Sequence, residues 1–203
     1  PVPGERGVVA RPPRPRPPPP PSAAGGAGVG LPPPLPLPLP APPPEQLERE
    51  GVEKPDACTA FCDLLGEGER TLLAAYNAQF DLNFLYHFLR PFGQVGILRA
   101  PRFLDVLTVY RDRRDYPHKL SDAIAAYGLE DQAVNSHRAV DDARAAAILL
   151  DAMAAERDDL DRYIDLFGYS PKYGVSGRRI GSVTYRPQSY QRIRPLYEVT
   201  ETV

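Results

Sequence analysis

Residues 71–89, TLLAAYNAQFDLNFLYHFL, decide the fold of this chain. Residues 71–76 form a short and nearly continuous apolar run, which is typical of a strand buried on both faces. Asn77 follows the run, and residues 80–89 are then apolar at the spacing of one helix face. The sequence therefore predicts a buried strand that leads directly into a helix, which ends before Pro91 and Gly93.

The flanking segments extend this pattern of alternating strands and helices. A second apolar run, RFLDVL at residues 102–107, predicts a second buried strand. Apolar periodicity predicts helices at residues 56–65, 120–127 and 139–155, the last of them rich in Ala and Leu. This order predicts an α/β domain with helices packed on a sheet.

Composition divides the chain into three parts. Nineteen of the 26 prolines fall in residues 1–44, and because proline lacks an N–H donor we expect a disordered or polyproline II leader there. Residues 45–167 are the expected folded domain. Residues 168–203 are a basic, tyrosine-rich extension, in which we expect loops and at most a hairpin, with a strand near residues 182–185.

Several classes of protein are excluded or disfavoured. No run of 18 apolar residues exists, which excludes a membrane span, and the first residues do not resemble a signal peptide. Cys58 and Cys62 are too few for a disulfide framework or a zinc site, so we expect free thiols on one helix face in a reducing cytoplasm. Residues 1–44 carry a charge of +3 and residues 168–203 carry +4, so the net charge of −2 leaves −9 for the domain. An acidic domain suits cation binding better than simple nucleic-acid binding.

Carboxylates occur at two places where the chain enters a helix. Asp81 lies in the first turn after the predicted strand, at the edge where open α/β sheets bind ligands. Asp142 lies in the first turns of the helix over residues 139–155, five residues after His137. Taken singly, each of the two acids is typical of a helix start, and the His137 imidazole is typical of an exposed loop. Their combination and order point instead to one shared pocket.

Two motifs resemble those of a known family. AYNAQFDLNFL at residues 75–85 is similar to the second motif of the DnaQ-like (DEDDh) 3′→5′ exonucleases, H-N-A-x-F-D-x-x-F-L. SHRAVDDARAA at residues 136–146 is similar to their third motif, H-x4-D. The intervening segments FLDVLTVYRD and HKLSDAIAAYGL also resemble the family, so the similarity covers residues 56–153.

The resemblance implies an α/β, ribonuclease H-like fold, with a mixed sheet flanked by helices. It also implies roles for the matching residues: Asp81 and Asp142 as metal ligands and catalytic groups, His137 as the general base, Asn77 and Phe80 as residues of the substrate cleft, and Asp105 as a structural acid. Asp141 does not fit H-x4-D and receives no role.

The implied chemistry is hydrolysis of a phosphodiester bond with two Mg²⁺ or Mn²⁺ ions, which carboxylate oxygens suit. A neutral imidazole near a bound water can take its proton. The implied product is a nucleoside monophosphate from the 3′ end, and the expected substrate is DNA, as single strands or 3′ ends. A proofreading or repair role, with a DNA polymerase as partner, follows from the same resemblance.

The family's first motif, D-x-E-x-T-G, is not found. Residues 48–51, EREG, lack an apolar strand and lie too close to Asp81 to leave room for the first strands of the sheet. We therefore expect a domain that lacks its first strands. Either the native protein is a complete exonuclease whose front is lost here, or the chain is an impaired remnant that binds nucleic acid or a polymerase. We favour the first because Asp81, His137 and Asp142 are present; a proline-rich adaptor is a third interpretation.

The extension carries one more hypothesis. Its basic side chains alternate with tyrosines that could stack on unpaired bases while the cations contact phosphates. The alternative is a solvated extension that packs loosely on the domain. The residues in question are Lys172, Arg178, Arg179, Arg186, Arg192 and Arg194, with Tyr169, Tyr173, Tyr185 and Tyr190.

Overall fold

The computed structural model describes residues 44–66, 71–133, 139–189 and 194–199. The chain divides into two compact units, residues 1–38 and 39–203, and every described residue belongs to the second. The predicted leader lies outside the described residues except for Pro44, with which helix α1 (Pro44–Glu50) begins.

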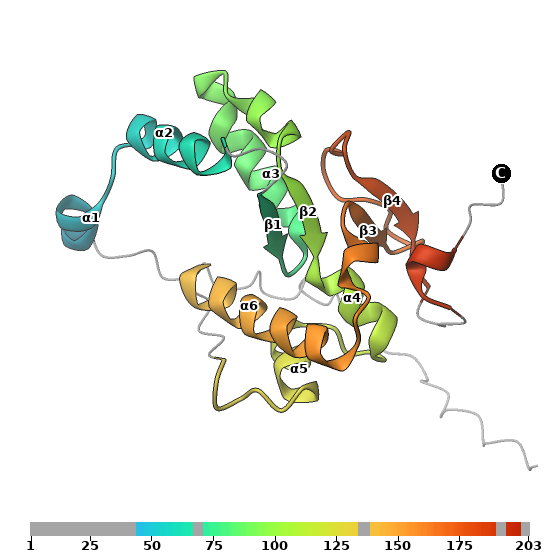
Figure 1. Cartoon of the computed structure of the whole chain (residues 1–203). Coiled ribbons are helices and arrows are strands. Elements are labelled where there is room, and N and C mark those ends of the chain that lie inside the picture. The colour runs from blue at the N-terminus through green and yellow to red at the C-terminus, as the bar shows by residue number, and fades with distance from the viewer. Residues whose placement is uncertain (1–43, 67–70, 134–138, 190–193, 200–203) are drawn as a thin grey trace, which may run out of the picture. The chain divides into compact units, whose positions relative to one another are not determined.

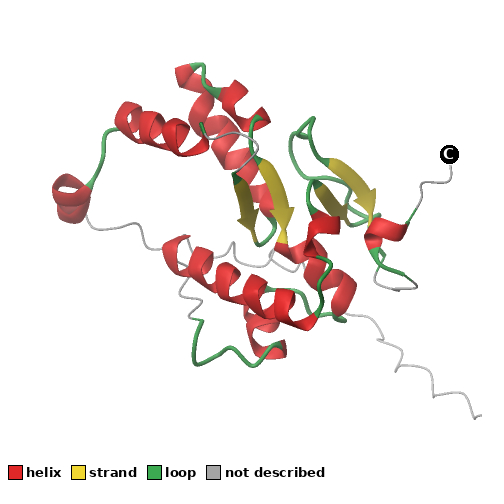
Figure 2. Ribbon diagram, viewed as in Figure 1, coloured by secondary structure: helices red, strands yellow, loops and turns green. Residues whose placement is uncertain are grey.

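The predicted strand, turn and helix at residues 71–89 are confirmed. Strand β1 (Leu72–Ala75) pairs in parallel with β2 (Arg102–Asp105), and α3 (Ala78–Leu89) forms most of the crossover between them (Figures 1 and 2). Two short 3₁₀ helices, η2 (Arg90–Phe92) and η3 (Val95–Arg99), complete that crossover. Within the described ranges β1 pairs with β2 alone.

A second parallel pair follows later in the chain, formed by β3 (Leu166–Tyr169) and β4 (Thr184–Pro187). The expected hairpin is therefore wrong, because these strands run in the same direction and need the long connection over residues 170–183. The predicted boundary between residues 167 and 168 falls inside β3. The extension thus supplies part of the second strand pair.

Asp165 joins the two strand pairs. Its backbone N–H donates to the Phe103 carbonyl at 2.7 Å, and its carboxylate accepts from the Phe103 N–H at 2.8 Å. Its own carbonyl accepts from the Thr184 N–H at 2.7 Å. A φ of +58° lets one residue turn between both strands, so β3 lies beside β2.

The predicted helices are confirmed as α2 (Lys54–Leu65), α5 (Leu120–Ala126) and α6 (Ala139–Glu156). The run at residues 102–107 is a strand only as far as Asp105, and α4 (Val106–Arg113) begins directly after it. The sequence did not predict α4, and its strand prediction ran past Asp105 because Val106 and Leu107, the buried first residues of α4, continue the apolar run of β2. The remaining elements are η4 (Leu160–Tyr163) and η5 (Leu196–Glu198).

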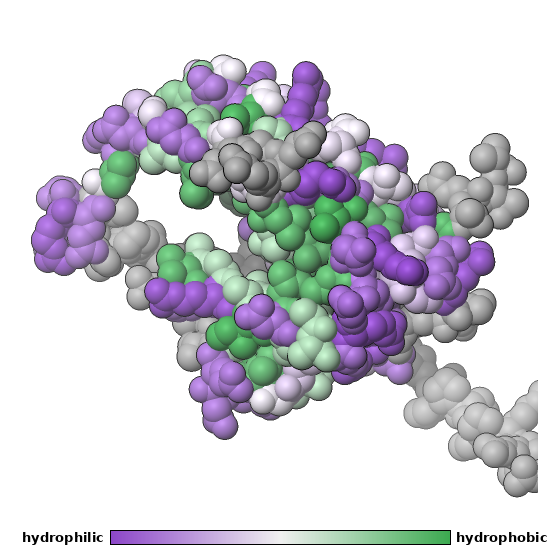
Figure 3. Space-filling model, in the orientation of Figure 1, coloured by the Kyte–Doolittle hydropathy of each residue, from purple (hydrophilic) through white to green (hydrophobic). Residues whose placement is uncertain are grey.

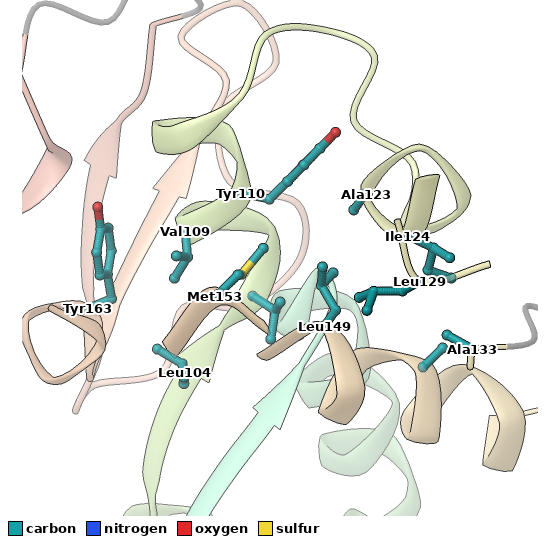
Figure 4. Close-up of a cluster of buried hydrophobic side chains, with 12 residues drawn as sticks. Leu104, Val109, Tyr110, Ala123, Ile124, Leu129, Ala133, Leu149, Met153 and Tyr163 are labelled. Carbon is teal, nitrogen blue, oxygen red and sulfur yellow. The ribbon is translucent and has the colours of Figure 1, made fainter. Parts of the chain in front are cut away.

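Two hydrophobic clusters form the core. One joins α4 and α5 to α6, and Figure 4 shows Val109, Ile124, Leu149 and Met153 converging in it. The other packs α2 and α3 against β2, β3 and β4. On the face seen in Figure 3, hydrophobic residues also gather over the β1–β2 region, and Leu72 of β1 is 44% exposed.

Two of the exclusions drawn from the sequence can be checked on the described helices. None of them is long and apolar enough to cross a membrane. Cys58 is buried and Cys62 half-buried in α2, and both are free thiols as predicted.

Candidate active site

The junction between β1 and α3 places the first predicted acid. Asn77 takes a left-handed φ of +68°, which lets the chain leave the strand and begin the helix at Ala78. The Ala78 N–H then donates to Oδ1 of Asp105 at 3.0 Å, which ties the helix start to the end of β2. Asp81 lies in the first turn of α3, as predicted. It therefore sits near the carboxyl ends of the parallel strands, where such sheets bind ligands.

The environment of Asp81 favours a cation. Its side chain is exposed, yet surrounding protein atoms partly desolvate the carboxylate and raise its pKa, and the negative charge of Asp105 adds to the rise. A carboxylate in such surroundings gains from a nearby positive charge.

Asp105 is committed to the fold. It is 4% exposed, and its Oδ2 accepts from the Thr108 hydroxyl at 2.6 Å, while Oδ1 accepts from Ala78. Burial raises the pKa of Asp105. Because both oxygens hold hydrogen bonds within the protein, the geometry agrees with a structural role for this acid.

The second predicted acid, Asp142, lies in the first turn of α6 beside Asp141. Its Oδ1 is buried and has no hydrogen-bond partner among the described residues. A buried carboxylate oxygen without a partner is unfavourable, and it is also the hard donor that Mg²⁺ and Mn²⁺ prefer. Asp142 therefore fits a divalent cation in its donor chemistry.

The two helices that carry the predicted acids contact the same strand. Both α3 and α6 contact β1, so Asp81 and Asp142 each lie in the first turn of a helix packed against that strand. In the part of the chain that the structure describes, no three His, Cys, Asp or Glu side chains group closely enough to hold a metal ion. A metal centre at Asp81 and Asp142 would need ligands beyond these two. His137 lies outside the described residues.

The two residues predicted to shape the substrate cleft lie on different features. Asn77 lines a cavity of about 210 Å³ together with Gln79, Asp105 and other residues. Phe80 is instead 56% exposed, and its ring centre lies 4.8 Å from that of Phe84, which is 64% exposed. An exposed aromatic pair of this kind can stack on unpaired bases.

The sequence did not reveal the role of Gln79, which is buried in α3. Its Nε2 donates to the carbonyl of Ser176 at 3.0 Å and to that of Arg178 at 2.7 Å. The available signal was a polar residue between Ala78 and Leu82 on the buried face of a largely apolar helix.

The extension packs on the domain, so the expectation of loose packing is wrong for its described part. Tyr185 is 9% exposed, and Arg186 donates from Nη1 to the Leu196 carbonyl at 3.0 Å. The Tyr185 ring is therefore not available for the base stacking that we expected of it, and Nη1 of Arg186 is already bonded within the protein. Tyr190 and Arg192 lie outside the described residues.

Comparison with known proteins gives one match. A family model described as Exonuclease matches residues 44–150, which is more than half of the chain. The match runs from α1 into α6 and includes Asp81, His137 and Asp142. No curated protein and no solved structure matches the chain.

Proposed function

The chain belongs to the exonuclease family, whose members are nucleases, and from this premise we propose that it removes nucleoside monophosphates from the 3′ end of DNA. The reaction is a metal-dependent hydrolysis of the terminal phosphodiester bond. The observation that carries the proposal is the placement of Asp81 and Asp142 in the first turns of two helices that contact β1.

Each residue has a defined part in this proposal. Asp81 and Asp142 would hold divalent Mg²⁺ or Mn²⁺, whose charge offsets negative charge on the attacking and leaving oxygens. The unpartnered Oδ1 of Asp142 supports its assignment as a ligand. His137 would take the proton from the attacking water, which is the role that the motif resemblance implies for it.

The biological setting is part of the same proposal. A proofreading or repair nuclease acts on single-stranded 3′ ends, and the exposed Phe80–Phe84 pair offers such an end a stacking surface. A DNA polymerase is the proposed partner. The two free thiols of α2 support a reducing compartment, and we propose the cytoplasm.

A second candidate function is binding without cleavage. The family's first motif, D-x-E-x-T-G, is not found in the sequence, which favours an impaired member of the family that binds nucleic acid or a polymerase. This candidate predicts that the chain binds a single strand but releases no nucleotide.

Single-turnover cleavage separates the two functions. The substrate is a 5′-labelled single strand of DNA, with RNA in parallel, in Mg²⁺ or Mn²⁺. We expect the unchanged chain to shorten the strand from its 3′ end. The rate of shortening should fall in Asp81→Asn, Asp142→Asn and His137→Ala, in each by more than the ~10–100-fold loss that is typical of changes to the groups surrounding metal ligands. Asp151→Asn, on an exposed part of α6, is the matched control and should cleave as the unchanged chain does.

The outcomes are distinct. Shortening from the 5′ end, or full activity in Asp142→Asn, would contradict the proposed reaction. Binding without any cleavage in either metal supports the second candidate. Denaturant unfolding shows that a variant is folded, and Asp142→Asn should unfold at the same or a higher denaturant concentration because its Oδ1 has no hydrogen bond to lose.

A further inference from the structure

A strongly basic groove lies between η3, α3 and the connection from β3 to β4, and of these three elements only the connection lies beyond residues 44–150. Its volume is about 590 Å³, and Arg99, Arg178 and Arg179 line it with Tyr86 and Ile180. The described residues that line it include no Asp or Glu. Three cations around one hollow, without an acid among its walls, create a positive potential that attracts anions.

Hydrogen bonds hold the connection that carries two of these arginines on α3. Gln79 donates to the carbonyls of Ser176 and Arg178, and Asn83 Oδ1 accepts from the Arg178 N–H at 3.1 Å. The Tyr185 hydroxyl, which is also buried, donates to Gln79 Oε1 at 2.7 Å. These bonds fix the backbone beside the groove before any ligand arrives, which reduces the entropic cost of binding.

A glycine makes this close approach possible. Gly177 has a φ of +73°, and a Cβ there would lie 2.1 Å from Nδ2 of Asn83. Any other residue would strain the backbone at this φ and displace the Asn83 side chain, whose amide bonds the connection to α3. The chain is built to keep the segment around residue 177 against the helix.

The arginine side chains are paired with aromatic rings. The Arg178 guanidinium lies 4.9 Å from the ring centre of Tyr86 and donates to its hydroxyl at 2.7 Å. Arg179 lies 5.3 Å from the ring centre of Tyr185 and 5.9 Å from that of Tyr169. Among the described residues, none of the ion pairs involves Arg99, Arg178 or Arg179.

Stacking orients a guanidinium without using up its charge. The planar group keeps N–H donors at its edge, and these match the paired oxygens of a phosphate. Several such groups along one groove suit a ligand with successive phosphates better than a single anion.

We propose that this groove binds the phosphodiester backbone of single-stranded nucleic acid. The choice of nucleic acid among polyanions rests on the proposed function, whereas the groove itself does not use Asp81, His137 or Asp142. The site would hold the substrate strand away from the reacting end. It gives a chain whose central part is acidic a basic surface for the phosphodiester backbone.

The test measures binding in the absence of divalent metal, so that cleavage plays no part. The probe is a fluorescent oligothymidylate, and its affinity for the full chain is followed by anisotropy over a range of salt concentrations. The variant carries Arg99→Gln, Arg178→Gln and Arg179→Gln. We expect the variant to bind the probe more weakly. The slope of log Kd against log salt concentration should also be smaller, by about 0.7 for each phosphate that the variant no longer neutralises.

Two controls make the result specific. Arg162→Gln removes an exposed arginine that also stacks on a tyrosine, Tyr197, but does not line the groove, and it should leave the slope unchanged. The triple Arg→Lys variant keeps the charges and should recover most of the slope.

An unchanged slope in the triple Arg→Gln variant would overturn the proposal. So would equal affinity for a sulfated polysaccharide of similar charge, which would make the groove a general polyanion site. If the chain cleaves DNA but the triple Arg→Gln variant keeps the salt slope of the unchanged chain, this inference alone is contradicted. If the slope falls in that variant but the unchanged chain cleaves nothing, only the proposed reaction is contradicted.

Discussion

The Thr108 hydroxyl links three parts of the fold through one hydrogen-bond chain. It is completely buried, it accepts from the Gly168 N–H of β3 at 2.8 Å, and it donates to Asp105 at 2.6 Å. Asp105 in turn accepts from the Ala78 N–H at the start of α3, 27 residues earlier in the chain. The helix start that carries Asp81 is therefore positioned by Asp105 and by the hydroxyl of α4 that orients it.

Replacing the Thr108 hydroxyl tests this series of hydrogen bonds directly. Thr108→Val keeps the shape but leaves the Gly168 N–H and one Asp105 oxygen without partners, so we expect a loss of about 1–3 kcal/mol in the free energy of unfolding. Thr108→Ser keeps the hydroxyl and should lose less. Urea unfolding of the unchanged protein and the two variants measures both effects. Equal stability of Thr108→Val and the unchanged protein would contradict the role given to this hydroxyl.

Among the helices, α4 and α6 are joined by one buried cation. Arg113, at the end of α4, is completely buried and donates to the Met153 carbonyl and to Asp159 Oδ1, each at 2.5 Å. The last turn of α6 contains no basic residue, so an arginine from another helix satisfies its carbonyl. This contact fixes α6, and hence Asp142 at its other end, against the rest of the core.

Two arginines that share the same acid should differ greatly in importance. Arg113→Met leaves Asp159 buried without its main partner and should cost about 3–5 kcal/mol of stability. Arg157 is half exposed and lies 3.7 Å from Asp159, so Arg157→Met should cost about 0–1 kcal/mol. Thermal or denaturant unfolding compares the two variants, and similar losses would show that burial does not decide the strength of these pairs.

The molecule as a whole depends on its basic extension. Gln188 is buried and donates from Nε2 to the Thr108 carbonyl at 3.0 Å and to Asp112 Oδ1 at 2.5 Å. Val183, Tyr185 and Leu196 each contribute buried side chains to the fold. Residues beyond the family match are thus part of the same folded unit.

Truncation therefore has a clear expected result. Removing residues 168–203 deletes β4 and three buried side chains, each worth about 1.5–3 kcal/mol. The sum is comparable with the whole stability of many domains, about 5–15 kcal/mol, so we expect loss of cooperative unfolding. A chain ending at residue 199 is the control and should keep the unfolding midpoint. A sharp, unshifted transition in the shorter chain would contradict this dependence.

Stability should also fall in alkaline solution. Burial raises the pKa of Tyr76 and Tyr163 above its ordinary value of 10.0, and burial together with the Glu156 carboxylate raises the pKa of Tyr127 to about 12. The folded chain holds these protons more tightly than the unfolded chain does. Their stabilising contribution is therefore complete below pH 10 and is lost as the pH rises toward 12.

Urea unfolding at about pH 9 and about pH 11, on either side of the ordinary tyrosine pKa, measures this loss. Tyr127→Phe should make the decline shallower. Tyr173→Phe, at a position 74% exposed, should not change it. A stability that is constant over this range would contradict the role given to the buried phenols.

Local sequence was enough to predict most elements and the two acids at helix starts. Hydrophobic spacing acts over a few residues, so the strand at β1, the turn at Asn77 and the helices α2, α3, α5 and α6 could be inferred directly. It misled at residues 106 and 107, where the buried and apolar start of α4 continues the apolar run of the strand before it. The motif resemblance, and with it the family, was also contained in the sequence.

Contacts between distant residues were decided only by the tertiary structure. Nothing local to residues 166–187 indicates that two strands pair in parallel, or that Asp165 turns between them and β2. Likewise, Arg99 joins Arg178 and Arg179 around one groove only because Gln79 and Asn83 hold a segment about 95 residues later against α3. Such pairings depend on the free energy of packing the whole chain, which short-range patterns do not record.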